Sequence, residues 1–180
     1  RIYVEASVGK VTDVKLEYSK MLQITFNQAM DETTLINPET KELLNSAVLI
    51  TPEKVNGVAA SDPGTLKGYL SEDKTVLSIE STNIFDGTYS VLVSDKVKTG
   101  SGAFVESYYE QKTLKDTVGP SLKQIAVDET GTTCIVTFTE PVDISRLVVK
   151  NPEKTDKTVI YSGTAMFTDA SKYVLSEDKR

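Results

Sequence analysis

The alternation of apolar and polar residues along this chain has a period of two, and no long segment has the 3.6-residue period of a helix. The apolar residues of 14–16 alternate with Asp13 and Lys15, and those of 22–26 with polar neighbours, on either side of a turn at 18–20. These segments are predicted to form an antiparallel hairpin with one apolar face. Further short strands are predicted at residues 47–51, 67–70, 75–79, 88–93 and 103–109, a spacing that indicates an all-β chain of the sandwich type.

Residues that favour turns separate the predicted strands. Such turns are predicted at 37–41, 62–64, 71–74, 86–87 and 99–102, where Asn, Asp, Pro, Gly or Ser gather. One helical turn is predicted after Asp31, since an Asp side chain can cap the free N–H groups that follow it. Asp143 offers the same option before residues 144–147, so capping explains the repeated Asp before any ligand is invoked.

Part of the sequence occurs twice. Residues 11–31 return as 122–143 with one extra residue in the first turn, and residues 69–74 return as 174–179. A period of roughly 110 residues is far longer than a solenoid unit of ~20 to 50, so each copy is predicted to be a domain with its own core. The polar segment around Gly119-Pro120 interrupts the alternation and is the predicted junction.

The repeat predicts how the chain is divided. Residues 1–5 are interpreted as the tail of a preceding module or a linker, residues 6–116 as one sandwich, and residues 117–180 as a partial second sandwich. The second is interpreted as truncated because the first copy continues beyond the point that corresponds to residue 180. We therefore expect the chain to be part of a longer tandem array.

Composition removes several classes of function. The net charge is −6, with 20 Lys and Arg against 26 Asp and Glu, and no basic cluster interleaves with aromatic residues, which argues against nucleic-acid binding. The chain has no His and one Cys, which excludes a His/Cys zinc site, a Ser-His-Asp triad and a Cys-His pair within this sequence. No apolar run is long enough to span a membrane.

Acidic residues provide the remaining candidate chemistry. Neighbouring carboxylates occur at 31–32, 128–129 and 177–178 and as Glu106 with Glu110, but they fall in predicted turns or on polar strand faces, where solvated charge is expected. No catalytic or cofactor-binding residue is predicted, and the chain is not expected to be an enzyme. Calcium is the better hypothesis, because loop carboxylates and carbonyls can supply its six to eight oxygen ligands.

The first calcium candidates are Asp31, Asp116 and Asp143, although the sequence contains no Asp-x-Asp-x-Asp-Gly loop. The metal-binding residues therefore stay open.

Two further features admit a functional and a structural interpretation. Cys134 occupies the position of Leu22 on the repeated apolar face, so a small buried hydrophobic side chain is expected, with a reactive thiol as the alternative. Tyr108 and Tyr109 could form a sugar-stacking platform. Adjacent residues on a strand point to opposite sides, however, so one of them should face the core and a carbohydrate site is not expected.

Three motifs carry a resemblance to a known family: residues 24–31 (ITFNQAMD), residues 87–102 (GTYSVLVSDKVKTGSG) and residues 116–120 (DTVGP). Together they resemble the bacterial immunoglobulin-like modules repeated in surface-layer (S-layer) proteins of Gram-positive bacteria. Similar modules occur in adhesins and beside secreted carbohydrate-active enzymes. The resemblance implies an extracellular array of immunoglobulin-like β-sandwiches that forms a two-dimensional lattice on the cell wall, often with calcium as cement. Cys134 departs from the pattern, because such proteins generally lack cysteine.

Three functional hypotheses follow. The preferred one is a structural module of a self-assembling S-layer lattice on the bacterial cell surface, acting as a semi-rigid strut and lattice contact. Its partners would be neighbouring subunits, with attachment to the cell wall through other parts of the parent protein and with neither nucleic acid nor a membrane span. The alternatives are a stalk or binding module of an adhesin, and an accessory domain of a secreted enzyme.

Overall fold

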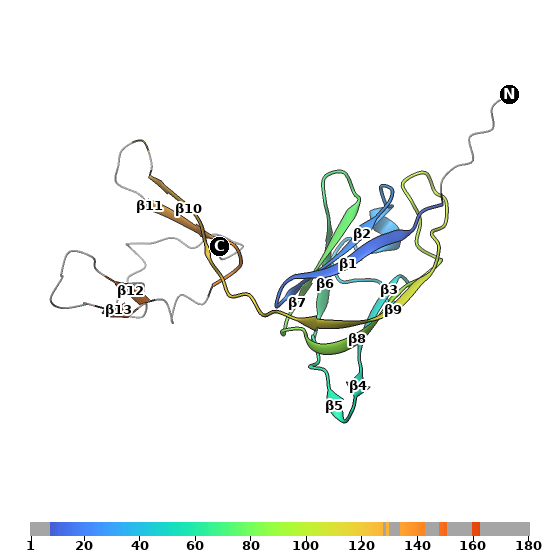
Figure 1. Cartoon of the computed structure of the whole chain (residues 1–180). Coiled ribbons are helices and arrows are strands. Elements are labelled where there is room, and N and C mark those ends of the chain that lie inside the picture. Colours follow the sequence, from blue (N-terminus) through green and yellow to red (C-terminus); the bar gives the residue numbers. More distant parts are fainter. Residues whose placement is uncertain (1–7, 128, 130–133, 143–147, 151–159, 163–180) are drawn as a thin grey trace. The chain divides into compact units, whose positions relative to one another are not determined.

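The computed structural model describes residues 8–127, 129, 134–142, 148–150 and 160–162 (Figure 1). The chain divides into two compact units, Arg1–Thr117 and Val118–Arg180, which are described separately below. The interpretation of residues 1–5 as a tail lies outside the described residues, and the assignment of 6–116 and 117–180 as domains stays a prediction. No helix in the described part of the chain has the length and apolar content needed to cross a membrane.

The first unit consists of antiparallel strands and one short 3₁₀ helix. In chain order these are β1 (Val11–Tyr18), β2 (Met21–Phe26), η1 (Glu32–Thr34), β3 (Val48–Pro52), β4 (Lys54–Val55), β5 (Val58–Ala59), β6 (Leu66–Leu70), β7 (Val76–Ser81), β8 (Asp86–Val93) and β9 (Tyr108–Lys115). One sheet has the order β1-β2-β7-β6, another β3-β8-β9, and β4 pairs only with β5. The two larger sheets have the strand order of a constant-type immunoglobulin sandwich. The prediction of an all-β chain is confirmed.

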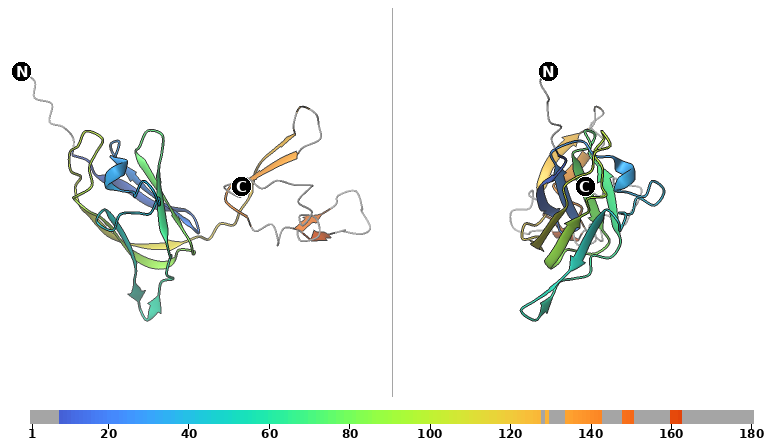
Figure 2. Two further views of the ribbon diagram at one scale, coloured as in Figure 1. Left: turned by 180° about the vertical axis from the view of Figure 1, so that it is seen from behind. Right: turned by 90° about the vertical axis from the view of Figure 1, so that its right-hand side faces the viewer.

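The core lies between these two sheets (Figures 1 and 2). In β2, Leu22, Ile24 and Phe26 are buried while their neighbours are partly exposed, as expected for a strand with one face on the core. Leu22 and Ile24 lie opposite Ile79 and Leu77 of β7. The predicted hairpin and its apolar face are therefore confirmed.

The last strand of this unit lies further along the chain than predicted. A strand was expected at 103–109, but β9 spans Tyr108–Lys115. Val105 instead forms an isolated parallel bridge with Gly9 and bonds through its N–H to the carbonyl of Val97 at 3.0 Å. Within β9 only Leu114 is buried, and the half-buried residues are Tyr108 and Lys112, so the strand has no regular apolar alternation to reveal it.

Asp86 and Gly87 were predicted to form a turn, but they are the first residues of β8. Gly87 has a φ of +130°, a conformation that side-chain-bearing residues rarely adopt. A Cβ atom there would lie 2.6 Å from the Cα atom of Ala60. Glycine therefore allows the chain at Ala60 to cross closely over the start of this strand.

A small hairpin formed by β4 and β5 was missed in the sequence. We call residues 54–59 the arm. Its turn is Asn56-Gly57, with φ values of +50° and +83°, the left-handed pair that a two-residue type I′ hairpin requires. In Figures 1 and 2 the arm projects away from the sandwich. The Asn-Gly dipeptide was the available signal, but the strands on either side are too short to show a period.

The second unit contains two described strand pairs. β10 (Leu122–Val127) pairs with β11 (Cys134–Phe138), and β12 (Val148–Lys150) with β13 (Ile160–Ser162), both antiparallel. The pair β10–β11 has a register shift between Leu122 and Gln124. The pair β1–β2 has one between Val11 and Asp13, the corresponding residues of the first copy, and a second between Leu16 and Tyr18.

The open end of each of these two hairpins is closed in the same way. In the first copy, Asn27 N–H donates to the carbonyl of Lys10 at 3.1 Å, and Lys10 N–H donates to the Asn27 side chain at 2.8 Å. In the second, Thr139 N–H donates to the carbonyl of Ser121 at 2.9 Å, and Ser121 N–H donates to the Thr139 hydroxyl at 3.0 Å. The repeated sequence thus forms a repeated structure down to its closing bonds.

Candidate functional site

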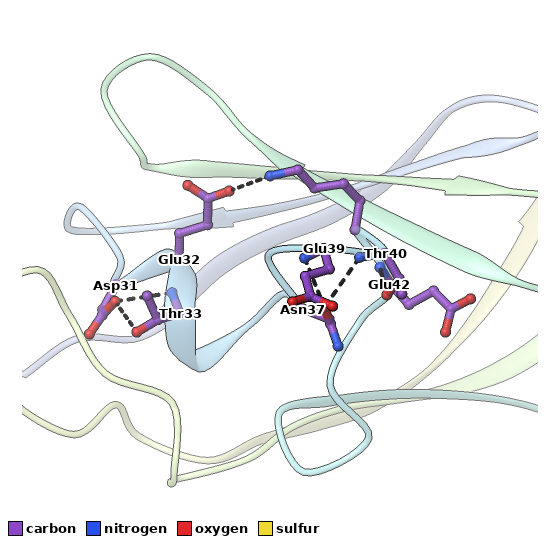
Figure 3. Close-up of polar contacts among 8 residues, drawn as sticks. Asp31, Glu32, Thr33, Asn37, Glu39, Thr40 and Glu42 are labelled. Atoms are coloured by element: carbon purple, nitrogen blue, oxygen red, sulfur yellow. Dashed lines mark hydrogen bonds and ion pairs between the residues drawn. The ribbon is translucent and has the colours of Figure 1, made fainter.

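Asp31 caps the 3₁₀ helix η1, as predicted (Figure 3). Its carboxylate accepts hydrogen bonds from the backbone N–H and the hydroxyl of Thr33, at 3.1 and 2.7 Å. The neighbouring Glu32 forms an ion pair with Lys41 at 3.5 Å. The two adjacent acids therefore bind different partners. The equivalent helical turn predicted after Asp143 lies outside the described residues.

The segment after η1 is held by a second side chain. The Asn37 side-chain oxygen accepts from the N–H groups of Glu39 and Thr40, at 2.9 and 3.2 Å (Figure 3). Such Asx bonds replace backbone hydrogen bonds in a tight turn. This confirms the predicted turn at 37–41 and gives its polar residues a structural role.

Asp116 ties two distant parts of the first unit together. Its carboxylate accepts from the N–H of Ser19 in the β1–β2 turn at 3.0 Å, which fastens the end of β9 to that turn. Toward the other end of β1, Glu106 N–H donates to the carbonyl of Gly9 at 2.8 Å. The side of the sandwich formed by β1 and β9 is therefore held at both ends.

The calcium candidates are not brought together. The backbone N–H of Asp31 donates to the carbonyl of Lys98, whereas the carboxylate of Asp116 accepts from the N–H of Ser19. Asp143 lies outside the described residues. Within the described ranges, no group of three or more His, Cys, Asp or Glu side chains could hold a metal ion. Asp31 and Asp116 thus do not fit one shared calcium site.

Glu110 has the electrostatics of a paired surface carboxylate. The Tyr108 hydroxyl donates to it and the Lys112 ammonium lies 3.2 Å away, and these contacts, the hydroxyl first, lower the pKa of Glu110. A carboxyl group that acts as the general acid of a glycosidase needs a raised pKa instead. Burial, followed by the bond to Glu110, raises the pKa of Tyr108. Asp128, Glu177 and Asp178 lie outside the described residues.

Tyr108 and Tyr109 point to opposite sides, as predicted. Tyr108 packs against the core, whereas Tyr109 is 63% exposed. On the outer face of the smaller sheet, Tyr109 lies opposite Leu92, which in turn lies opposite Leu49 of β3.

For Cys134 the structure describes only the backbone, which pairs with Val127. The side chain of Cys134 is not among the described ones, so its burial stays a prediction.

Tyr89 fixes the base of the arm, a role that sequence reasoning missed. The side chain is fully buried, and its ring packs edge-on against Phe85 with centroids 5.4 Å apart. Its hydroxyl donates to the carbonyl of Ser61 at 2.8 Å and accepts from the N–H of Asp86 at 3.0 Å. In immunoglobulin-like sandwiches a tyrosine near the start of the corresponding strand bonds to upstream backbone in the same manner.

Two backbone hydrogen bonds hold the base of the arm where it leaves the sandwich. Glu53 N–H donates to Thr88 and Ala60 N–H donates to Glu53, each at 2.9 Å. Beyond this base, Val55 and Val58 lie opposite each other across the hairpin, 41% and 73% exposed. The fold therefore presents a fixed pair of apolar side chains to solvent.

Replacing Tyr89 by phenylalanine should loosen this base. The ring and its packing would remain, but the Ser61 carbonyl and the Asp86 N–H would each lose a bonding partner. We expect the free energy of unfolding to fall by about 1–3 kcal/mol, with faster amide hydrogen exchange at residues 54–61. Tyr69→Phe on β6, where the side chain is 43% exposed, is the matched control and should change stability by less than about 0.5 kcal/mol. Equal exchange in the two variants would contradict the assigned role.

A hollow of about 280 Å³ lies along β3. It is formed by the edge of β3, the start of β6 and the segment that precedes β3. Its lining includes Glu42, Asn45, Leu49, Thr65 and Leu66. The arm leaves from the end of β3 and the chain returns to β6, the two strands whose residues line the hollow.

Comparison with known proteins gives structural similarity only. No family model matches the chain, and no curated protein matches its sequence. Among solved structures, it is similar to the crystal structure of the S-layer protein rSbsC(31-844), with 22% identity and a TM-score of 0.47 over 68% of this chain and 15% of that one.

Two further structures show the same degree of similarity. Domains 1–6 of surface layer protein SbsC give 18% identity and a TM-score of 0.47, over 87% of this chain and 19% of that one. The native conformation of E. coli alpha-2-macroglobulin gives 19% identity and a TM-score of 0.43, over 64% of this chain and 6% of that one. The chain thus spans a small part of the length of each of these proteins.

Proposed function

We propose that this chain is a structural module of a self-assembling S-layer lattice on the bacterial cell surface, where it acts as a semi-rigid strut and lattice contact. The observation that carries the proposal is the repeated hairpin. β1–β2 and β10–β11 share the register shift near their first residues and the same pair of closing bonds. A chain that repeats the same hairpin presents equivalent surfaces more than once. A lattice is held by many identical, modest contacts rather than by one tight site.

The internal bonding of the first unit supports the role of a strut. The carboxylate of Asp116 fastens β9 to the β1–β2 turn, and the Glu106–Gly9 bond fastens the same side of the sandwich near its other end. Between these points the core packs the two sheets face to face. Such a unit resists bending because any movement of one sheet against the other breaks bonds at an end.

We infer a non-catalytic role for the acids that the structure describes. Asp31 caps a helix, Asp116 binds a backbone N–H, and the pKa of Glu110 is lowered by its partners. The extracellular location and the attachment of the parent protein to the cell wall are part of the proposal and come from the resemblance of residues 24–31, 87–102 and 116–120 to S-layer modules.

A second candidate is the stalk or binding module of an adhesin, and a specific feature favours it. Tyr109 and the tip of the arm expose large apolar side chains on a rigid frame, which is what a receptor-binding surface requires. An accessory domain of a secreted enzyme is the remaining alternative. It would be recognised by a catalytic module in the parent sequence.

Electron microscopy of the full-length parent protein, with calcium and with a chelator, tests the proposal. We expect ordered two-dimensional sheets when calcium is present. Loss of the sheets on chelation would assign the metal to residues other than a site shared by Asp31 and Asp116, because the structure does not bring those two together. Dispersed rods under both conditions would contradict the lattice role and favour the adhesin or accessory-domain reading.

A further inference from the structure

We propose that the arm of one copy of this chain docks into the hollow beside β3 of a second copy, and that the second copy returns the same contact. The inference rests on the lattice function proposed above and names one of its contacts.

The arm contributes nothing to the core of its own unit. All residues of β4 and β5 are exposed, and none belongs to the core cluster. Val58 is 73% exposed and faces Val55 across the hairpin. Two valines held side by side on a type I′ hairpin lose little conformational freedom when a partner covers them. The arm is therefore preorganised for binding.

The hollow suits inserted side chains better than an added strand. β3 bonds to β8 through its odd-numbered positions, as shown by the bonds from Glu53 N–H to Thr88 and from Ser94 N–H to Ala47. Its even-numbered positions face outward, and there Pro52 has no N–H while Val48 N–H already donates to Leu44. Ile50 is then the one outward N–H donor left on β3, and an edge with a single donor resists strand pairing.

Side chains can instead fill the space that this edge leaves beside it. Leu49 and Leu66 supply apolar surface within the hollow, and Leu49 is 41% exposed. A convex pair of valines matches this concave, partly apolar volume of about 280 Å³.

Charge complementarity favours a second copy as the occupant. Lys54 is exposed on the arm and Glu42 is exposed at the rim of the hollow. Neither belongs to the ion pairs found among the described residues. Opposite charges at the edge of a contact speed association and fix its register. Because arm and hollow belong to the same unit, a two-fold axis between two copies can bring each arm to the other hollow at once.

Disulfide cross-linking of the 180-residue chain tests this contact, with Cys134→Ala as background because Cys134 is the single native thiol. A Val58→Cys chain is mixed with an isotopically labelled Asn45→Cys chain in oxidised glutathione, and heterodimers are counted by mass spectrometry. The control replaces Asn45→Cys by Lys15→Cys, an exposed position on β1. We expect about tenfold more heterodimer with Asn45→Cys. Equal yields would show random collision and overturn the proposal.

A charge exchange adds a readout that altered folding could not produce. Lys54→Glu in both chains should reduce the yield about three- to tenfold, because attraction becomes repulsion. If one chain carries Lys54→Glu and the other Glu42→Lys, every reciprocal arm–hollow contact again joins opposite charges, and the yield should return. Lys15→Glu in both chains is the matched charge control and should leave it unchanged. Failure of the mixed pair to recover would also overturn the proposal.

The failure of this contact and the failure of the lattice role can be told apart. If the parent protein forms sheets but the test and control pairs cross-link equally, the lattice role is supported and the arm contact is excluded. Selective cross-linking with no sheets formed by the parent would establish the contact and remove the lattice role.

Discussion

Replacing Ile24 by alanine is expected to lower the free energy of unfolding of the first unit by about 2–5 kcal/mol. The Ile24 side chain is completely buried and lies opposite Leu77 in the larger sheet. Removing it leaves a cavity between two sheets that are tied along one side and cannot fully collapse. Urea unfolding followed through the amide NMR signals of residues 8–117 measures the change for this unit alone.

The repeat supplies a matched control for this substitution. Val136 is the residue of the second copy that corresponds to Ile24, but it is 41% exposed. Val136→Ala should change the stability of its own unit by less than about 1 kcal/mol. An equal loss in both units would show that the apolar face of the second hairpin is covered as fully as that of the first, contrary to this structure.

The parts of the fold that could be predicted are those with one face on the core. In β2, the burial of Leu22, Ile24 and Phe26 imposes a period of two on the sequence, so the strand and its apolar face could both be predicted. The opposite orientations of Tyr108 and Tyr109 followed from the same geometry.

The parts that could not be predicted lack this constraint. β9 is an edge strand whose only fully buried side chain is Leu114, so most of its residues are polar and it was placed too early. The arm has no buried residue at all. Its only sequence signal is the Asn56-Gly57 turn, which predicts a hairpin but says nothing about where that hairpin projects.

Whether the role of a polar residue could be predicted depends on how far along the sequence its partner lies. Asp31 caps Thr33, two residues away, and such local bonding can be predicted from sequence. Asp116 bonds to Ser19, 97 residues earlier, and Tyr89 to Ser61, 28 residues earlier. These bonds exist only because the sheets bring distant segments together, so the sequence offered Asp116 as a possible metal ligand and gave no indication of Tyr89.

Gly87→Ala should be the second strongly destabilising substitution, with an expected loss of about 2–4 kcal/mol. Two effects add. The φ of +130° at Gly87 is strained for any residue that carries a side chain. In addition, the new methyl group would lie 2.6 Å from the Cα atom of Ala60, so backbone rather than a flexible side chain would have to move. Because Ala60 belongs to the base of the arm, we also expect arm-to-hollow cross-linking to fall.

Gly102→Ala separates the two effects. Gly102 has a φ of +85°, but a Cβ atom there would meet nothing within 4 Å. This variant carries the backbone strain alone and should lose about 1–2 kcal/mol, with cross-linking unchanged. If both variants lose the same stability in urea unfolding, the close approach of Ala60 to Gly87 contributes nothing. If Gly87→Ala loses more stability than Gly102→Ala and is the one variant that weakens cross-linking, the crossing at Ala60 holds the arm in its binding position.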